Sequence, residues 1–390
     1  MKPNGMNSEN SRRTFLKGLT FTIGSSVIGI PLFSFCSGES SGSQPEEKQT
    51  GSAASQNKKL GIALVGLGGY STHQLAPALQ ETKNCYLAGI VTGTPSKAET
   101  WKAKYNIPDK NIYNYQNFDQ IAENKDIDIV YVVLPNAMHA EYTIRAAKAG
   151  KHVICEKPMA TSVEDAQRML EACRQNKVQL AIGYRLHYDP FHQRVMELGQ
   201  KQVFGKVKSI RAHNGFTMGG PGSWRLDRER SGGGPLMDMG IYCVQGACYT
   251  LGKAPVAVTA KFGEVTRPEL FSEVEQSISW RMEFEDGVIA ECNSSYAERE
   301  DFLEGKAEKG WWRLGPSFGY EGKQGETSQG RMNYPNIFEQ AWQMDGQAES
   351  FRNNNSSIVP GEMGLRDVRI LMAIYESARS GGKRVPISYK

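Results

Sequence analysis

Residues 59–182 alternate between short apolar runs and helical segments. Four runs have the length and composition of strands: residues 59–65, 86–91, 127–134 and 152–155. The third run is nearly all apolar, which is typical of a strand buried on both faces. Residues 140–149 show a helical pattern, and Gly150 follows as its expected C-cap. Strands and helices that alternate at this spacing predict a parallel, doubly wound sheet.

The second half of the chain shows the two-residue alternation of antiparallel strands. The clearest segments are residues 207–213, 256–262, 277–284 and 288–294. We expect a mostly antiparallel sheet with one face on helices. Residues 298–347 follow no regular pattern, so only sheet edges and loops are expected there. Residues 363–380 are amphipathic and precede a glycine pair, which predicts a C-terminal helix packed back on the first sheet.

The N-terminal segment has the pattern of an export signal. In residues 1–36 the pair Arg12-Arg13 precedes a glycine-diluted apolar stretch, which is typical of a twin-arginine signal. Residues 37–57 are rich in Ser, Gly, Glu and Gln and are expected to form a flexible tether. Cys36 leaves two alternatives open: a lipid attached after a lipoprotein signal, or cleavage nearby with an incidental cysteine.

These patterns predict two folded domains, an α/β domain at residues 58–182 and an α+β domain at residues 183–390. The formal net charge of +4 is too small to indicate nucleic-acid binding. Residues 1–36 carry four basic side chains and one acidic side chain, so the remaining chain is nearly neutral. The six cysteines after Cys36 form no C-x-x-C pair, and we expect buried free thiols rather than a zinc site.

A glycine-rich segment follows the first strand and predicts a dinucleotide site. Residues 66–71 read G-x-G-x-x-S, a pattern whose glycines let a pyrophosphate approach the helix N-terminus, although a plain glycine-rich turn is the alternative. No acidic residue follows the second strand; small hydroxyl side chains and Lys97 follow instead, which favours NADP over NAD. The candidate cofactor residues of the strand-end loops are Gly66, Leu67, Gly68, Gly69, Tyr70, Thr92, Gly93, Thr94, Lys97, Leu134, Pro135, Asn136, His139, Glu156 and Lys157.

Three further side chains could form a proton-transfer cluster with the cofactor. Lys157 follows the fourth strand, whose end lies beside the expected cofactor crevice. Asp238 and Tyr242 lie four residues apart after a glycine run and Pro235, so they share one face of a predicted helix. Alcohol oxidation at a nicotinamide needs a base within hydrogen-bond reach of the reacting hydroxyl. The alternatives are a helix first-turn charge for Asp238 and a half-buried aromatic for Tyr242.

An ordered set of segments resembles the Gfo/Idh/MocA oxidoreductase family from about residue 60 to the C-terminus. The segments are residues 65–68, 134–136, 155–163, 183–190, 224–226, 232–242 and 367–369. Many members have histidine where this chain has Tyr242; the tyrosine is similar to the glucose–fructose oxidoreductase branch. The resemblance implies a Rossmann domain, a second α+β domain with a large open sheet, and a homo-oligomer, a dimer or tetramer, assembled through that sheet.

The resemblance also implies roles for the cluster. Tyr242 is expected to act as base or acid, Lys157 as its electrostatic partner, and Asp238 as the group that orients the sugar and the lysine. Arg185, Trp224 and Arg225 are added as candidate cofactor contacts. The expected substrate contacts are Lys157, Arg185, Tyr188, Asp238 and Tyr242.

The export signal and the family resemblance together predict an exported, NADP-dependent sugar oxidoreductase. It would oxidise an aldose such as glucose to its lactone and reduce a ketose such as fructose with a cofactor that stays bound. The alternatives are a sugar dehydrogenase with exchangeable cofactor, a cofactor-dependent glycoside hydrolase of the same family, and a non-catalytic sugar sensor. Expected partners are small sugars, further copies of the chain and the twin-arginine export machinery of a periplasmic protein.

Overall fold

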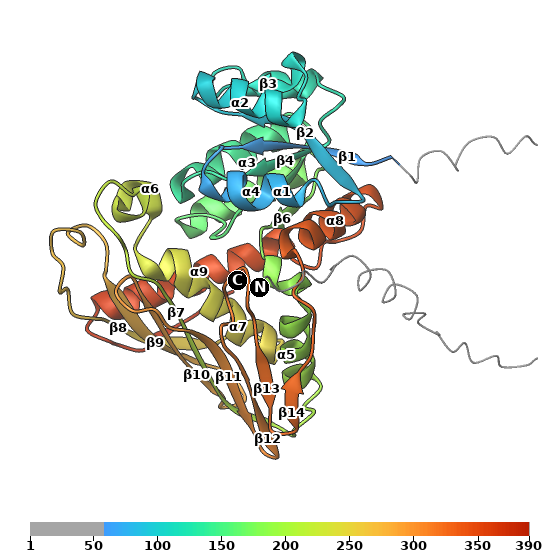
Figure 1. Cartoon of the computed structure of the whole chain (residues 1–390). Helices are drawn as coiled ribbons and strands as arrows, with labels where there is room; N and C mark the ends of the chain where they lie inside the picture. Colours follow the sequence, from blue (N-terminus) through green and yellow to red (C-terminus); the bar gives the residue numbers. More distant parts are fainter. Residues whose placement is uncertain (1–57, 390) are drawn as a thin grey trace, which may run out of the picture. The chain divides into compact units, whose positions relative to one another are not determined.

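The computed structural model describes residues 58–389, so the predicted signal, the tether and Cys36 lie outside the described residues. Six parallel strands form the first sheet in the order β3-β2-β1-β4-β5-β6 (Figure 1). They are β1 (Leu60–Val65), β2 (Cys85–Val91), β3 (Ile112–Tyr113), β4 (Ile129–Val132), β5 (His152–Cys155) and β6 (Leu180–Ile182). The chain order reverses between β1 and β4, where such sheets bind ligands. The predicted doubly wound sheet is confirmed.

Helices cover both faces of the first sheet. They are α1 (Ala76–Ala78), α2 (Pro95–Tyr105), α3 (His139–Lys148), α4 (Val163–Gln175) and α8 (Glu339–Arg352). Ile62 and Leu64 of β1 pack in one cluster with residues of α1, α2 and α8. Ala63 and Val65 face the opposite side and pack with residues of α3 and α4. Because both faces are buried, the strands read as continuous apolar runs.

Nine strands form the second sheet in the order β14-β13-β12-β11-β7-β10-β9-β8-β15. They are β7 (Val207–Gly215), β8 (Ala257–Phe262), β9 (Ser277–Glu283), β10 (Ile289–Ser295), β11 (Asp301–Ala307), β12 (Gly310–Leu314), β13 (Gly325–Thr327), β14 (Gly330–Met332) and β15 (Val385–Pro386). Strands β7 and β10 run parallel, and the other neighbours are antiparallel. The sheet is therefore mixed and mostly antiparallel, as predicted.

The second sheet buries one face. In β9 the side chains of Ile278, Trp280 and Met282 are buried, whereas Ser279 and Arg281 between them are exposed. Figure 1 shows helices on the inner face of this sheet, and they are α5 (Pro190–Gln200), α7 (Ile241–Leu251) and α9 (Gly361–Arg379). Helix α9 is the helix predicted near residues 363–380.

The outward face of the second sheet carries ion pairs. Lys208 Nζ lies 2.8 Å from a carboxylate oxygen of Glu308, and an Arg211 nitrogen lies 3.3 Å from one of Glu304. Obligate subunit interfaces are usually apolar at their centre. The expected pairing of subunits through this face stays a prediction.

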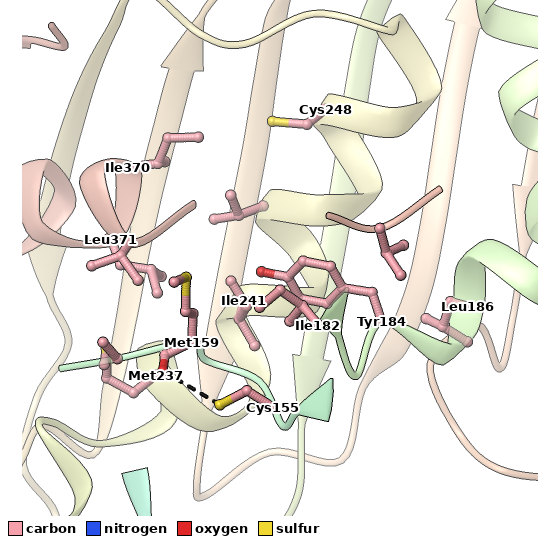
Figure 2. Packing of buried hydrophobic residues seen from close by; sticks show 14 of the residues in the cluster. Cys155, Met159, Ile182, Tyr184, Leu186, Met237, Ile241, Cys248, Ile370 and Leu371 are labelled. Carbon is pink, nitrogen blue, oxygen red and sulfur yellow. Dashed lines mark hydrogen bonds between the residues drawn. The ribbon is translucent and has the colours of Figure 1, made fainter. Parts of the chain in front are cut away.

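A single apolar core continues from the first sheet to the second (Figure 2). It joins Cys155 at the end of β5, Met159 after that strand, Ile182 of β6, Ile241 of α7 and Leu371 of α9. The Cys155 thiol also donates to the Met159 carbonyl oxygen at 3.7 Å. The carboxyl end of β5 is thereby held against the start of α7. Lys157 follows the first of these segments, and Asp238 and Tyr242 lie at the second.

Residues 298–347 are more regular than expected. Strand β11 lies inside the second sheet, between β7 and β12, rather than at its edge. Helix α8 covers the first sheet, and its buried positions include Glu339, Gln340, Gln343 and Gln347. The expectation of edges and loops alone was wrong. In α8 these polar residues share the buried side with Ala341, Met344, Ala348 and Phe351, which obscures the apolar period of the helix.

Within residues 58–389 all six cysteines are buried and unpaired. No cluster of three or more His, Cys, Asp or Glu residues in this part is arranged to hold a metal ion. A search of the same residues finds no helix with the length and apolar character that crossing a bilayer requires.

Candidate active site

The glycine-rich turn after β1 opens onto a large cavity. Gly66 has φ +95°, and a Cβ there would lie 2.5 Å from the Val133 carbonyl oxygen, so glycine is required. Gly68 faces open space and, with Gly69, lines a cavity of about 750 Å³, within the range of roughly 300–1,000 Å³ usual for cofactor sites. Ser71 stands where the dinucleotide fingerprint has Gly or Ala, and its hydroxyl donates to the Gly66 carbonyl oxygen at 2.6 Å.

The loop after β2 lines one end of this large cavity. Thr92, Gly93 and Thr94 present no carboxylate to it. Lys97 follows in the first turn of α2, and its ammonium donates to the Leu67 carbonyl oxygen at 3.2 Å while two donors remain. Small hydroxyl groups and an ammonium fit a ribose that carries a 2′-phosphate. The residues present therefore fit NADP.

Lys157 lies where β5 ends, at the opposite end of the large cavity. Its ammonium donates to the Asp238 carbonyl oxygen at 2.8 Å and lies 3.4 Å from Oδ1 of the same residue. The preceding Glu156 also lines the cavity and accepts from the Tyr131 hydroxyl at 2.6 Å. The sequence predicts both residues at this place, because they come directly after the fourth predicted strand.

The carboxylate of Asp238 is held by two cations. Arg225 Nε donates to Oδ2 at 2.7 Å, the Tyr296 hydroxyl donates to the same oxygen at 3.2 Å, and Lys157 lies at Oδ1. Burial alone would raise the pKa of Asp238, but the charges and hydrogen bonds of Arg225 and Lys157 outweigh it and lower that pKa to about 2. Asp238 is therefore ionised at neutral pH and is a poor base.

A buried carboxylate fixes the turn that carries Asp238. Glu275 accepts from the backbone N–H of Gly234 at 3.0 Å and of Leu236 at 3.2 Å. The Tyr375 hydroxyl donates to Glu275 at 2.8 Å. These bonds satisfy the free N–H groups at the start of the helical segment, which continues as a wide turn at Leu236–Gly240 and then as α7.

Tyr242 lies in the first turn of α7, four residues after Asp238. The Lys157 ammonium lies 4.8 Å from the centre of its ring, and the Arg185 guanidinium lies 5.3 Å from that centre. Two cations therefore flank the phenol, and both stabilise negative charge that forms on its oxygen.

A second cavity of about 380 Å³ adjoins the first. Its walls include Asn214 and Phe216 at the end of β7, and Phe318 and Gly319 of a loop after β12. The two cavities share five lining residues, which mark the place where a ligand of one meets a ligand of the other: Lys157, Arg225, Asp238, Tyr242 and Tyr320.

Most of the predicted site residues line one or both cavities. The larger cavity includes Leu67, Tyr70, Leu134, Pro135, Asn136 and Trp224 besides the residues already named. Arg185 lines only the smaller cavity. Which of these residues contact cofactor or substrate stays a prediction.

Two predicted residues lie elsewhere. His139 is buried, with one ring nitrogen 2.9 Å from the Pro158 carbonyl oxygen and the other 2.8 Å from that of Leu134. Tyr188 is buried against Gly346 of α8 and lines neither cavity. The structure therefore does not bring His139 or Tyr188 to either cavity, because each follows a site segment in the chain but turns its side chain into the core.

The sequence did not indicate Tyr320 or Phe318 as lining residues, because they lie on an irregular loop without a motif. His73, Gln74 and Tyr115 also line the larger cavity and were not predicted. His73 and Gln74 lie in a helical turn at Ser71–Leu75, directly after the glycine-rich segment. Their closeness to that segment in the sequence is a signal that would have indicated them.

The lowered pKa of Asp238 predicts a pH-dependent contribution to stability. A carboxyl pKa that falls from 3.8 to about 2 on folding contributes roughly 2 kcal/mol at pH 6. About half of this should be lost at pH 3, since protonation of the unfolded chain precedes that of the folded chain. Urea unfolding of the protein and Asp238→Asn at both pH values measures it. An equal pH dependence of the two would contradict the assignment.

The fold and the site together define an oxidoreductase with an NAD-binding Rossmann fold. Residues 60–184 match the family model described as "Oxidoreductase family, NAD-binding Rossmann fold", and residues 192–310 match the GFO/IDH/MocA C-terminal domain. The chain belongs to the Gfo/Idh/MocA oxidoreductase family.

Several relatives match along most of their length. The chain is 30% identical to D-xylose 1-dehydrogenase [NADP(+)] of Haloarcula marismortui over 332 residues, which cover 82% of this chain and 91% of that protein. It is 38% identical to the aldose-aldose oxidoreductase of Caulobacter crescentus, solved in complex with glycerol; the match has a TM-score of 0.82 and covers 85% of this chain and 100% of that one. D-xylose 1-dehydrogenase (NADP(+)) 2 of Haloferax volcanii is 25% identical, covering 82% of this chain and 98% of that protein.

Proposed function

We propose that the chain is an exported, NADP-dependent sugar oxidoreductase that retains its cofactor. It oxidises an aldose such as glucose to its lactone and then reduces a ketose such as fructose. The observation that carries this proposal is the cluster of Lys157, Asp238 and Tyr242 where the two cavities meet. The names of two relatives support the substrate class, since they specify D-xylose with NADP+ and a pair of aldoses.

The cluster can move the proton of a sugar hydroxyl. The bound nicotinamide supplies the hydride acceptor. The Tyr242 oxygen, as a phenolate, accepts the hydroxyl proton and becomes a neutral phenol, and it returns this proton to the second sugar in the reductive half-reaction. Lys157 and Arg185, at 4.8 and 5.3 Å from the ring centre, stabilise the charge that forms on the phenol. Asp238 stays ionised and orients Lys157 and the sugar hydroxyls, since its lowered pKa makes it a poor base.

The predicted twin-arginine signal in residues 1–36 supports retention of the cofactor. A twin-arginine signal serves proteins that fold before export, so a nucleotide bound in the cytosol can travel with the chain. Outside the cytoplasm no soluble pool of NADPH is expected, so the cofactor must be reoxidised in place. The paired half-reactions on two sugars follow from that requirement.

The test is made on the purified protein with no added nucleotide. We expect bound NADP(H) after denaturation, identified by mass, and a rise in near-ultraviolet absorbance when an aldose is added. Subsequent addition of a ketose should reverse that rise. Steady-state turnover on the sugar pair should follow ping-pong kinetics.

The D-xylose dehydrogenase relatives favour one alternative, a dehydrogenase that exchanges its cofactor. Protein that carries no nucleotide and depends strictly on added NADP+ would establish this alternative and overturn the retained-cofactor cycle. Turnover with added NAD+ alone would overturn the preference for NADP.

The proposal extends to location and assembly. Export by the twin-arginine machinery predicts that Arg12→Lys with Arg13→Lys leaves the protein in the cytoplasm, and lipid labelling tests the anchor at Cys36.

We further propose that two or four copies pair through the outward face of the second sheet. Because that face carries ion pairs, light scattering should show dissociation as salt rises.

A further inference from the structure

The side chain of Tyr320 lies on the boundary between the two cavities and lines both. Its side chain is 44% exposed. On one flank its ring stacks on that of Tyr70, with ring centres 6.0 Å apart and planes inclined by 28°. Tyr70 belongs to the glycine-rich segment, so this pair bridges the two sides of the larger cavity.

The Arg185 guanidinium packs against the ring of Tyr320. It lies 4.6 Å from the centre of the Tyr320 ring and 5.3 Å from that of Tyr242. An ion pair with Glu339 holds Arg185 inside the protein, where it is 2% exposed. The same cation thus connects Tyr320 to the reactive phenol.

The loop that carries Tyr320 is fixed rather than free. The Asp301 carboxylate accepts from the backbone N–H groups of Ser317, Phe318 and Gly319 at 2.8, 2.7 and 3.0 Å. Arg185 donates to the carbonyl oxygens of Phe318 and Gly319. A loop held by this many charge-assisted bonds is a permanent wall of the site.

Charged groups beneath the loop complete its anchorage. Lys323 pairs with Glu339 and lies 3.8 Å from Asp189, which in turn accepts from His192 at 2.9 Å. The second ring nitrogen of His192 lies 3.3 Å from the Ser317 hydroxyl. Ser317, His192 and Asp189 have the order of a hydrolytic triad, but all three are buried and line neither cavity. Their role is therefore to position the loop.

We propose that Tyr320 retains the dinucleotide: its exposed ring packs against the cofactor end nearest Lys157 and Tyr242, and with Tyr70 it closes the route by which the cofactor leaves. The proposal rests on the proposed function, since it requires a dinucleotide in the larger cavity. The further proposal is that Tyr320, a residue of the second domain, controls the rate at which the dinucleotide is released. Because Tyr320 is held by a fixed loop, cofactor release requires breaking the Tyr70–Tyr320 contact.

The test compares nucleotide release from the full-length protein and three variants. Each is loaded with NADP+ and chased with a large excess of a scavenging dehydrogenase, while tryptophan fluorescence reports release. We expect Tyr320→Ala to release NADP+ on the order of tenfold faster, since loss of an aromatic contact acts mainly through the dissociation rate. Tyr320→Phe should keep slow release because the ring remains. Trp342→Ala, at a 58% exposed site of α8 outside both cavities, is the matched control.

The outcomes separate this proposal from the proposed function. Release from Tyr320→Ala at the rate of the Trp342→Ala control overturns the retention role while leaving the enzyme proposal intact. Fast release from both Tyr320→Ala and Tyr320→Phe also overturns it, because the ring is then not the retaining group. Failure of the unmodified protein to bind any nicotinamide dinucleotide overturns both proposals. Circular dichroism confirms that each variant is folded.

Discussion

Replacement of Lys157 by methionine should lower kcat for sugar oxidation by about a thousandfold, within the range of roughly 10²–10⁴ that positioned acid–base groups supply. The Lys157 ammonium holds the Asp238 carbonyl oxygen at 2.8 Å and lies 4.8 Å from the centre of the Tyr242 ring. Without it, charge on the phenol oxygen loses one of the two cations that flank the ring, and one oxygen of Asp238 loses its ionic partner. Nucleotide binding should survive, since many other residues line the larger cavity.

Single-turnover reduction of bound NADP+ by an aldose measures this loss without interference from product release. Lys148→Met, on an exposed position of α3, is the control for a general loss of positive charge. Unchanged turnover in Lys157→Met would remove Lys157 from the mechanism.

The first sheet could be predicted because its strands are buried on both faces. All four residues of β4 are buried, so the strand reads as an apolar run bounded by polar segments. The lysine, carboxylate and phenol could be predicted as well, since Lys157 follows a strand end and Asp238 and Tyr242 are spaced by one helical turn. In these cases local pattern and tertiary position agree.

Two parts of the molecule could not be predicted because distant contacts define them. Helix α8 buries Gln343 and Gln347, which bond to the Tyr131 hydroxyl at 2.9 Å and the Ile182 carbonyl oxygen at 2.9 Å, so polar side chains share its inner face with apolar ones. The Tyr320 loop has no regular pattern, and its position depends on Asp301 and Arg185. No local signal in the sequence specifies such bonds.

The positions of His139 and Tyr188 outside the two cavities have a related cause. Both residues follow segments that do line a cavity, so proximity in the chain suggested proximity in the site. His139, at the first position of α3, turns inward and bonds to two carbonyl oxygens instead.

Replacement of Gly68 by alanine should lower NADP+ affinity by about a hundredfold without destabilising the protein. A Cβ at Gly68 would meet no protein atom within 4 Å, and the residue is exposed and lines the larger cavity. The new methyl group would therefore occupy space at the glycine-rich turn that the pyrophosphate needs for close approach to the backbone. Gly66→Ala differs, because its Cβ would clash with the Val133 carbonyl oxygen and should impair folding.

Thermal unfolding with and without NADP+ separates these effects. Gly68→Ala should unfold at the temperature of the unmodified protein when no nucleotide is present. At a nucleotide concentration about a hundred times the Kd of the unmodified protein, that protein gains roughly 2.7 kcal/mol, and Gly68→Ala should gain well under 1 kcal/mol. Gly220→Ala is the matched control, because Gly220 also faces open space but lines neither cavity. If Gly68→Ala and Gly220→Ala gained equally from NADP+, the dinucleotide would not lie against the glycine-rich turn, and the assignment of the larger cavity to the cofactor would fail.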